Sequence, residues 1–160
     1  MPQIMYVCLK LVLAAFLGGI IGFERKTFGK PAGSRTYAMV ALGSALFTII
    51  SIEGFVNVIN YDPSRIASQI VVGIGFLGAG LIIFHKQHIE GLTTAAALWA
   101  TAAVGMAVGI GWYTISIFAA ILILLILFIL GQFEVTKEQE KTLWDLFEKK
   151  GKKKNKWFSK

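Results

Sequence analysis

Residues 112–132 read WYTISIFAAILILLILFILGQ, with no Asp, Glu, Lys, Arg or His at any position. A helix rises about 1.5 Å per residue, so about 20 apolar residues cross a hydrocarbon core of about 30 Å. This stretch therefore predicts a transmembrane helix. Its Ile, Leu and Phe residues lie on every side, which is typical of a helix that faces lipid over most of its circumference.

Four more apolar stretches of similar length precede it, at residues 4–23, 36–55, 66–84 and 92–111. We therefore predict an all-α, polytopic membrane protein in which residues 1–132 form a bundle of five transmembrane helices. Residues 133–160 form a short, Lys-rich, amphipathic tail. The chain of 160 residues leaves no room for a further soluble domain of typical size, roughly 100 residues or more.

The charges between the stretches predict the orientation, because cytoplasmic loops are rich in Lys and Arg. Residues 24–35 carry four cations and one acid, and residues 133–160 carry nine Lys and five acids. The loop 56–65 and the turn at Gly111 carry little or no positive charge. We expect the N-terminus outside and the C-terminus in the cytoplasm. The net charge of +7 then reflects topology, and no nucleic-acid partner is expected.

Small residues concentrate in the third and fourth stretches, where they would let helix backbones approach closely. We expect these two helices to form the packed centre. The glycines assigned to helix packing are Gly75, Gly78, Gly80, Gly105 and Gly109. The pairs Gly18/Gly22 and Gly105/Gly109 have small-xxx-small spacing, and packing within the monomer is favoured over a dimer seam.

Two other patterns resemble functional motifs. Residues 73–78, GIGFLG, match G-x-G-x-x-G, but a dinucleotide site needs a preceding strand and a following acid, so a helix contact face is the better interpretation. His85 and His88 with Glu90 could form a metal site, although two histidines in a short loop are more often solvated.

Polar residues beside the apolar stretches are candidate functional residues, because charge is costly in hydrocarbon. Two groups are predicted. Glu24, Arg25, Arg35 and Thr36 form an inner cluster, with a plain topology signal as the alternative.

The outer group is Asp62, Arg65, Gln69 and Gly73, with Asp62 capping a helix and the others following along one helical face that continues to Phe76 and Gly80. Its alternative is that Arg65 and Gln69 only satisfy loop carbonyls.

Lys10 lies about 9 Å inside the first stretch if a helix begins at Ile4. Its ammonium can extend to the outer headgroups, or it can pair with Glu53 or Asp62. At the other end of the chain, the predicted tail should lie on the anionic inner leaflet, unless it serves only as a topology signal. Its lipid-facing residues are Lys149, Lys150, Lys152, Lys153 and Lys154.

Several glycine-rich motifs follow one another along the chain. They are GIIGFER at 19–25, AGSRT at 32–36, ALGSA at 41–45, RIASQIVVGIGFLGAG at 65–80, and GLTTAA with LWATA at 91–102. In this order they closely resemble the membrane domain of the MgtC/SapB family over residues 11–132. The resemblance implies a bacterial inner-membrane protein linked to growth in low magnesium, to survival inside macrophages and to modulation of membrane ATPases. Several members continue into a cytosolic domain, whereas here only the tail follows residue 132.

We expect a regulator or accessory protein of membrane ion transport, with a magnesium-linked channel or transporter as the alternative. An enzyme is not expected, nor is a resident cofactor; Mg²⁺ is the ion such a protein would handle. Mg²⁺ prefers oxygen ligands, yet all four acids of the membrane region lie at its edges. The expected partners are the lipid bilayer, another membrane protein such as an ATPase, and a second copy of the chain.

Overall fold

The computed structural model describes residues 2–55, 60–85 and 88–131. The predicted tail, including Lys149, Lys150, Lys152, Lys153 and Lys154, lies outside the described residues. Residues up to Leu124 form one compact unit, and the last helix continues beyond it.

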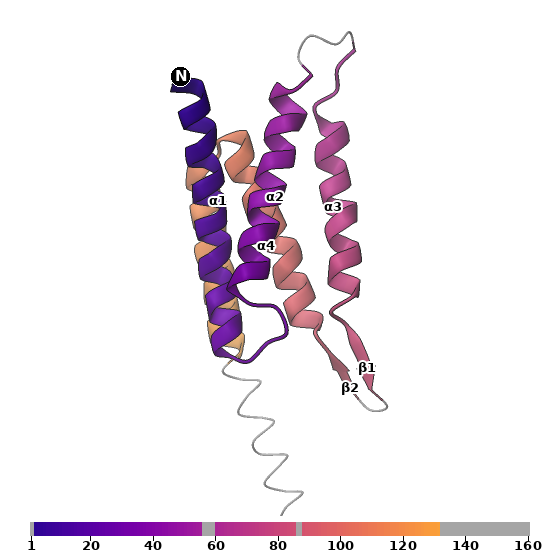
Figure 1. The fold of residues 1–160 in the computed structure, drawn as a ribbon. Coiled ribbons are helices and arrows are strands. Elements are labelled where there is room, and N and C mark those ends of the chain that lie inside the picture. Colours follow the sequence, from indigo (N-terminus) through magenta and orange to yellow (C-terminus); the bar gives the residue numbers. More distant parts are fainter. Residues whose placement is uncertain (1, 56–59, 86–87, 132–160) are drawn as a thin grey trace, which may run out of the picture. The chain divides into compact units, whose positions relative to one another are not determined.

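Five helices make up nearly all of this structure (Figure 1). They are α1 (Pro2–Thr27), α2 (Ser34–Glu53), α3 (Ser64–Ala79), α4 (Leu92–Ile110) and a C-terminal helix, Tyr113–Gly131. All except α3 are long and apolar enough to cross a membrane. The predicted all-α fold is therefore confirmed. Four of the five helices, and not all five, are candidate membrane spans by length and composition.

The third stretch differs from its prediction. The helix expected over residues 66–84 ends at Ala79, and a small antiparallel hairpin follows, with β1 (Ile83–His85) paired to β2 (His88–Glu90). The β-branched and aromatic residues Ile82, Ile83 and Phe84 suit a strand, and an apolar run does not by itself separate the end of a helix from a strand. At 16 residues, α3 is about 24 Å long.

Gly91 joins the hairpin to α4 and has to be glycine. Its φ is +86°, in the left-handed region, and a Cβ there would overlap the carbonyl oxygen of Leu81. The hairpin is therefore fixed against the end of α3 by a backbone contact.

Helix α2 is the centre of the compact unit, because α1 and α4 both pack against its backbone. On the α4 side, a Cβ on Gly105 would overlap the Ala41 carbonyl oxygen, and one on Gly109 would lie 2.8 Å from that of Ala45. The nonbonded contacts of Cβ atoms in real proteins are essentially never shorter than 3.0 Å. Only glycine allows this approach of the two helices.

The α1 side has a similar arrangement about two turns nearer the start of α2. A Cβ on Gly18 would clash with the Tyr37 carbonyl oxygen, and one on Gly22 would lie 2.8 Å from that of Gly33. The two small-xxx-small pairs, Gly18/Gly22 and Gly105/Gly109, thus pack against α2 from two sides, an arrangement that we call the glycine clasp. In α2, Tyr37, Ala41 and Ala45 are completely buried.

The expectation that the third and fourth stretches form the packed centre is wrong for α3. Only Ile74 and Gly78 of α3 are buried, and Cβ atoms on Gly73 or Gly75 would meet nothing within 4 Å. A Cβ on Gly78 would make an ordinary contact of 3.6 Å with Ala95 of α4. A glycine allows another helix to approach closely but does not require it. At Gly73 and Gly75 of α3, no neighbouring helix makes that approach.

The remaining assigned glycine, Gly80, also makes no contact with another helix. A Cβ there would meet only the carbonyl oxygens of Leu77 and Phe76, one turn back in its own chain. The packing assignments of Gly75 and Gly80 are therefore wrong, because no other helix approaches either position closely.

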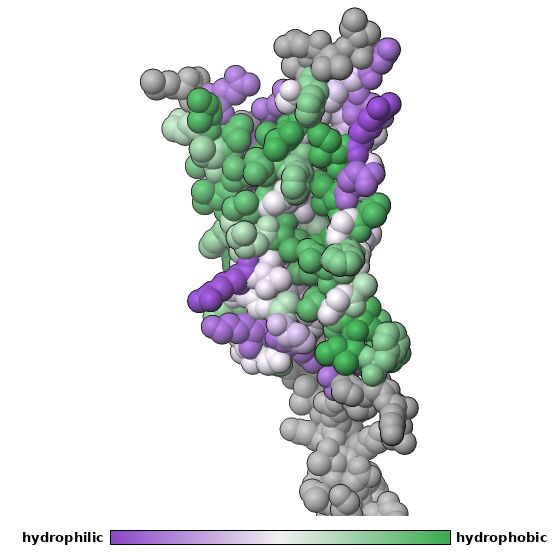
Figure 2. All heavy atoms as spheres, turned by 45° about the vertical axis from the view of Figure 1, so that its right-hand side comes forward, coloured by the Kyte–Doolittle hydropathy of each residue, from purple (hydrophilic) through white to green (hydrophobic). Residues whose placement is uncertain are grey.

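The surface agrees with a membrane environment. In Figure 2, hydrophobic side chains cover the middle of the visible face, and hydrophilic ones gather toward both ends. Large apolar side chains are well exposed, among them Phe16 (62%), Phe76 (81%) and Phe118 (61%). Such a surface is stable only where lipid or another protein covers it.

The glycine clasp gives a first prediction. Gly105→Ala should lower the free energy of unfolding by about 1–3 kcal/mol, because the added methyl forces α4 away from α2. The matched variant Gly75→Ala adds the same methyl in open space and should be neutral or gain up to about 1 kcal/mol of helix stability. Reversible unfolding in mixed micelles measures both variants. Equal effects would show that α4 and α2 are not in backbone contact.

Candidate functional site

The end of the bundle that holds the turn between α1 and α2 contains a buried ion pair. The carboxylate of Glu24 accepts hydrogen bonds from Nε and Nη2 of Arg25. The Arg25 side chain is 3% exposed and that of Glu24 11%. The chain then turns back, with the Lys30 amide donating to the Arg25 carbonyl and Gly29 at a φ of +65°. This pair therefore sits in the packed base of α1, where each charge is neutralised by its neighbour.

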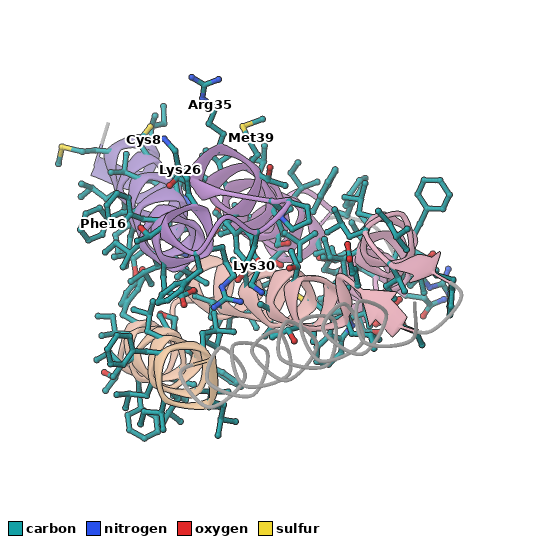
Figure 3. The ribbon with its side chains drawn as sticks, turned by 90° about the horizontal axis from the view of Figure 1, so that it is seen from below. Cys8, Phe16, Lys26, Lys30, Arg35 and Met39 are labelled. Carbon is teal, nitrogen blue, oxygen red and sulfur yellow. The ribbon has the colours of Figure 1, made fainter. Side chains whose placement is uncertain are left out.

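The other two residues of the predicted inner cluster lie elsewhere. Arg35 is exposed, and in Figure 3 it projects from α2 next to Met39, away from the bundle. Thr36 lines a groove between α2 and α3. The prediction that Arg35 joins Glu24 and Arg25 in one cluster is wrong, because Arg35 lies two residues before the buried Tyr37, which places the two side chains about 200° apart around the helix.

Tyr37 and Thr94 fasten the same end across two helices. The Tyr37 hydroxyl donates to the Thr94 carbonyl oxygen at 3.1 Å, and both residues are at most 1% exposed. The sequence analysis missed this contact. Its only signal is a tyrosine at the second position of an apolar stretch, because the hydroxyl of a buried tyrosine needs a hydrogen-bond partner.

Lys10 forms the main polar contact at the opposite end of the bundle. Its Nζ donates to the Gly109 carbonyl oxygen at 3.0 Å and lies 3.9 Å from Oε1 of Glu53 and 5.0 Å from the centroid of the Tyr6 ring. Lys10 is 6% exposed. Of the two alternatives left open for this residue, pairing with Glu53 holds, and extension to the headgroups does not.

The position of Lys10 follows from the end of α4. The last carbonyls of a helix lack partners within it. The Gly111 amide donates to the carbonyl oxygens of Ala107 and Val108, and the Trp112 amide donates to that of Ala107. Lys10 Nζ donates to the carbonyl oxygen of Gly109. A cation also interacts favourably with the negative C-terminal end of the helix dipole. Lys10 thus caps α4 from α1 and approaches the end of α2 through Glu53.

The predicted outer group divides into two parts. Asp62 accepts hydrogen bonds from the Ser64 hydroxyl at 2.7 Å and the Ser64 amide at 2.9 Å, and lies 3.8 Å from Nε of Arg65. The Ser64 hydroxyl and amide, with Arg65, hold the pKa of Asp62 below its ordinary value. The contribution of these hydrogen bonds to stability is present above the ordinary pKa and is lost as the pH falls through the lowered one. The predicted capping position is one residue off, because α3 begins at Ser64 and its N-cap is Pro63.

Gln69 and Gly73 belong to the groove. It is about 610 Å³ in volume and runs between α2 and α3. Thr36, Met39, Gly43 and Phe47 line it from α2; Gln69, Gly73 and Leu77 are among the residues that line it from α3. Arg65 is 82% exposed and does not line the groove, so the predicted functional face does not continue from Arg65 to Gly73.

The predicted stripe ends differently as well. Phe76 is 81% exposed and points out of the groove, and Gly80 lies after the end of α3. Only the middle of the stripe therefore faces α2.

Two of the candidate metal residues, His85 and His88, pair through their backbones in the hairpin, and their side chains are not among the parts that the structure describes. Among the residues that the structure describes, no three His, Cys, Asp or Glu side chains are grouped closely enough to hold a metal ion.

The fold and its polar ends define a polytopic membrane protein built on a glycine-packed helical bundle. The sequence model of the MgtC family matches residues 11–136, and the chain belongs to this family.

Three relatives illustrate the match. The chain is 48% identical over 129 residues to the Escherichia coli (strain K12) protein named "Putative magnesium transporter YhiD", covering 78% of this chain and 60% of that protein. It is 44% identical over 116 residues to "Protein MgtC" of Salmonella typhimurium (strain LT2), covering 72% and 48%. It is 40% identical over 126 residues to "Protein SapB" of Bacillus subtilis (strain 168), covering 75% and 54%.

The chain thus spans about half to three fifths of the length of these relatives. No solved structure gives a significant match.

The outer contact gives the second prediction. Lys10→Met should lower the free energy of unfolding by about 1.5–3 kcal/mol, because the Gly109 carbonyl loses a charged donor. Glu53→Gln should cost about 1 kcal/mol or less, since Glu53 is 41% exposed and water screens its charge. Unfolding in mixed micelles measures both variants and the double variant. Lys26→Met, which removes an exposed cation of the same helix, is the control, and a Lys10→Met protein as stable as the control would contradict the capping role.

Proposed function

We propose that this chain is a bacterial inner-membrane protein that regulates or assists magnesium-linked ion transport by contacting another membrane protein, without catalysing a reaction. In this proposal the N-terminus is outside and the C-terminus is in the cytoplasm, as the loop charges favour. The names of its relatives support the link to magnesium. Because the chain covers only part of those relatives, their whole activity is itself part of the proposal.

The observation that carries the regulatory role is the engagement of the acids. Within residues 2–55, 60–85 and 88–131, the acids are Glu24, Glu53, Asp62 and Glu90, and all lie at the ends of helices or in the hairpin. Glu24 is bonded to Arg25, Glu53 lies beside Lys10, and Asp62 is bonded to Ser64. Mg²⁺ gives up its water reluctantly and favours carboxylate ligands. These three carboxylates already interact with cations or hydroxyls of their own chain. Their engagement favours a role in stabilising the bundle over a role in conducting Mg²⁺.

The side of α3 that faces away from the rest of the bundle is the surface that we assign to the partner protein. It exposes Val72 (67%) and Phe76 (81%), and the hairpin beyond it exposes Phe84 (76%). A membrane ATPase is the partner that the family resemblance favours, and a second copy of the chain is the other candidate. Aromatic side chains at the centre of an apolar surface are typical contributors to binding energy.

A magnesium transporter in its own right is the second candidate function, which the name of the Escherichia coli relative favours. The two functions differ in what they require. A regulator needs its target, whereas a transporter works alone.

The third prediction separates them by genetics. In a bacterium lacking its own copy, the chain should restore growth in low magnesium, and this rescue should disappear when the membrane ATPase on which it acts is deleted as well. Phe76→Ala should weaken the rescue, and Phe118→Ala, an equally large change at a 61% exposed site on another helix, should not. Growth rate in magnesium-limited medium is the readout, with protein level in the membrane measured in each strain. Rescue that persists in every ATPase deletion would favour the transporter.

A further inference from the structure

The groove between α2 and α3 has a mostly apolar lining with a polar side chain toward each end. Because the two helices run in opposite directions, Thr36 of α2 and Leu77 of α3 lie near the inner end, and Phe47 and Gln69 lie toward the outer end. Between them Ser44 is the polar lining residue, and the others are apolar or lack a side chain, such as Val40, Gly43, Gly73 and Ile74. A mostly apolar lining suits an acyl chain, and a charge beside one end of the groove decides where its headgroup lies.

Arg35 provides a charge beside the inner end of the groove, although it does not line the groove itself. It precedes Thr36 and lies one helical turn before Met39, which lines the groove, and both side chains project from the same side of α2 (Figure 3). Within the part of the chain that the structure describes, neither the Arg35 guanidinium nor the Thr36 hydroxyl has a partner. A guanidinium binds phosphate through two parallel hydrogen bonds, and the hydroxyl adds a third donor.

From this geometry we propose that the α2–α3 groove binds one anionic phospholipid, with its phosphate on Arg35 and Thr36 and an acyl chain along Gly43 and Gly73. The site goes beyond the proposed function, since it requires no protein partner and no magnesium.

The size of the groove supports a lipid chain. Its volume of about 610 Å³ falls within the range of about 300–1,000 Å³ that is usual for small-molecule sites. A transmembrane helix about 10 Å across and 30 Å long occupies roughly 2,400 Å³, so it could seat only a fraction of itself here. The groove therefore fits a flexible chain better than a helix of a partner.

Two glycines keep the groove open. Cβ atoms on Gly43 and on Gly73 would meet nothing within 4 Å, so larger residues at these positions would extend into the groove without disturbing a helix contact. Gly75 also faces open space, but it does not line the groove. The chain thus offers a matched pair of substitutions, Gly73→Leu and Gly75→Leu.

The fourth prediction tests this site by native mass spectrometry of the full chain, released from nanodiscs that contain equal amounts of phosphatidylglycerol and phosphatidylcholine with the same acyl chains. One phosphatidylglycerol should be retained about tenfold over phosphatidylcholine, the ratio that about 1.4 kcal/mol produces. Arg35→Gln should abolish this preference, and Lys30→Gln, which removes an exposed cation of the preceding loop, should keep it. Gly73→Leu should lower retention of both lipids, and Gly75→Leu should not.

Each arm can overturn the proposal. Equal retention of the two lipids by the wild type, a preference that survives Arg35→Gln, or full retention in Gly73→Leu would each exclude it. Soluble glycerol phosphate that displaces the lipid at equal concentration would assign the site to free phosphates. If Gly73→Leu does not fold, Gly43→Leu fills the groove from α2 and takes its place.

Discussion

The structure depends on the close approach of α2 to helices on two sides. Lipid tails are as apolar as the helices themselves, so packing at short distance, and not apolar burial, holds a membrane bundle together. Gly18 and Gly22 of α1 and Gly105 and Gly109 of α4 provide that distance against the α2 backbone. Once α2 is clasped in this way, its remaining face, toward α3, is left to line the groove.

The positions of the buried cations depend on the same packing of α1 and α4 against α2. A charge inside hydrocarbon is costly, and the two buried cations sit where the bundle ends and a partner is present. Arg25 is neutralised by Glu24 at the base of α1, and Lys10 caps the last turn of α4 beside Glu53. Both ends are thereby closed by contacts within the chain. This closure is the physical basis for proposing that the protein acts on transport through a partner.

Much of this fold could be predicted from the sequence, because the signals involved are local. Apolar length gave the helices, and glycine spacing identified the two pairs that pack most closely. The partner helix could not be predicted, since Gly105 carries no information about which backbone it meets. The end of α3 was missed because residues 80–84 are as apolar as the helix before them, and only strand propensity distinguishes them. The candidate sites were harder still.

Arg35 and Glu24 are close in the sequence, yet they belong to different helices, and the Arg35 side chain projects away from the bundle (Figure 3). Lys10 shows the opposite case, in which a residue that could have reached solvent is held by an orphan carbonyl 99 positions away. Contacts between distant residues of this kind decide which charges are engaged, and charge counting along the chain does not reveal them.

The central claim is that this bundle influences ion transport through another protein and does not conduct Mg²⁺ itself. Its most direct test is Mg²⁺ entry into liposomes that contain only the purified chain and an internal magnesium-sensitive dye, under an inward Mg²⁺ gradient and a negative internal potential. Our account predicts a rate equal to that of protein-free liposomes at every protein density. A saturable Mg²⁺ flux that rises in proportion to the amount of protein would contradict it.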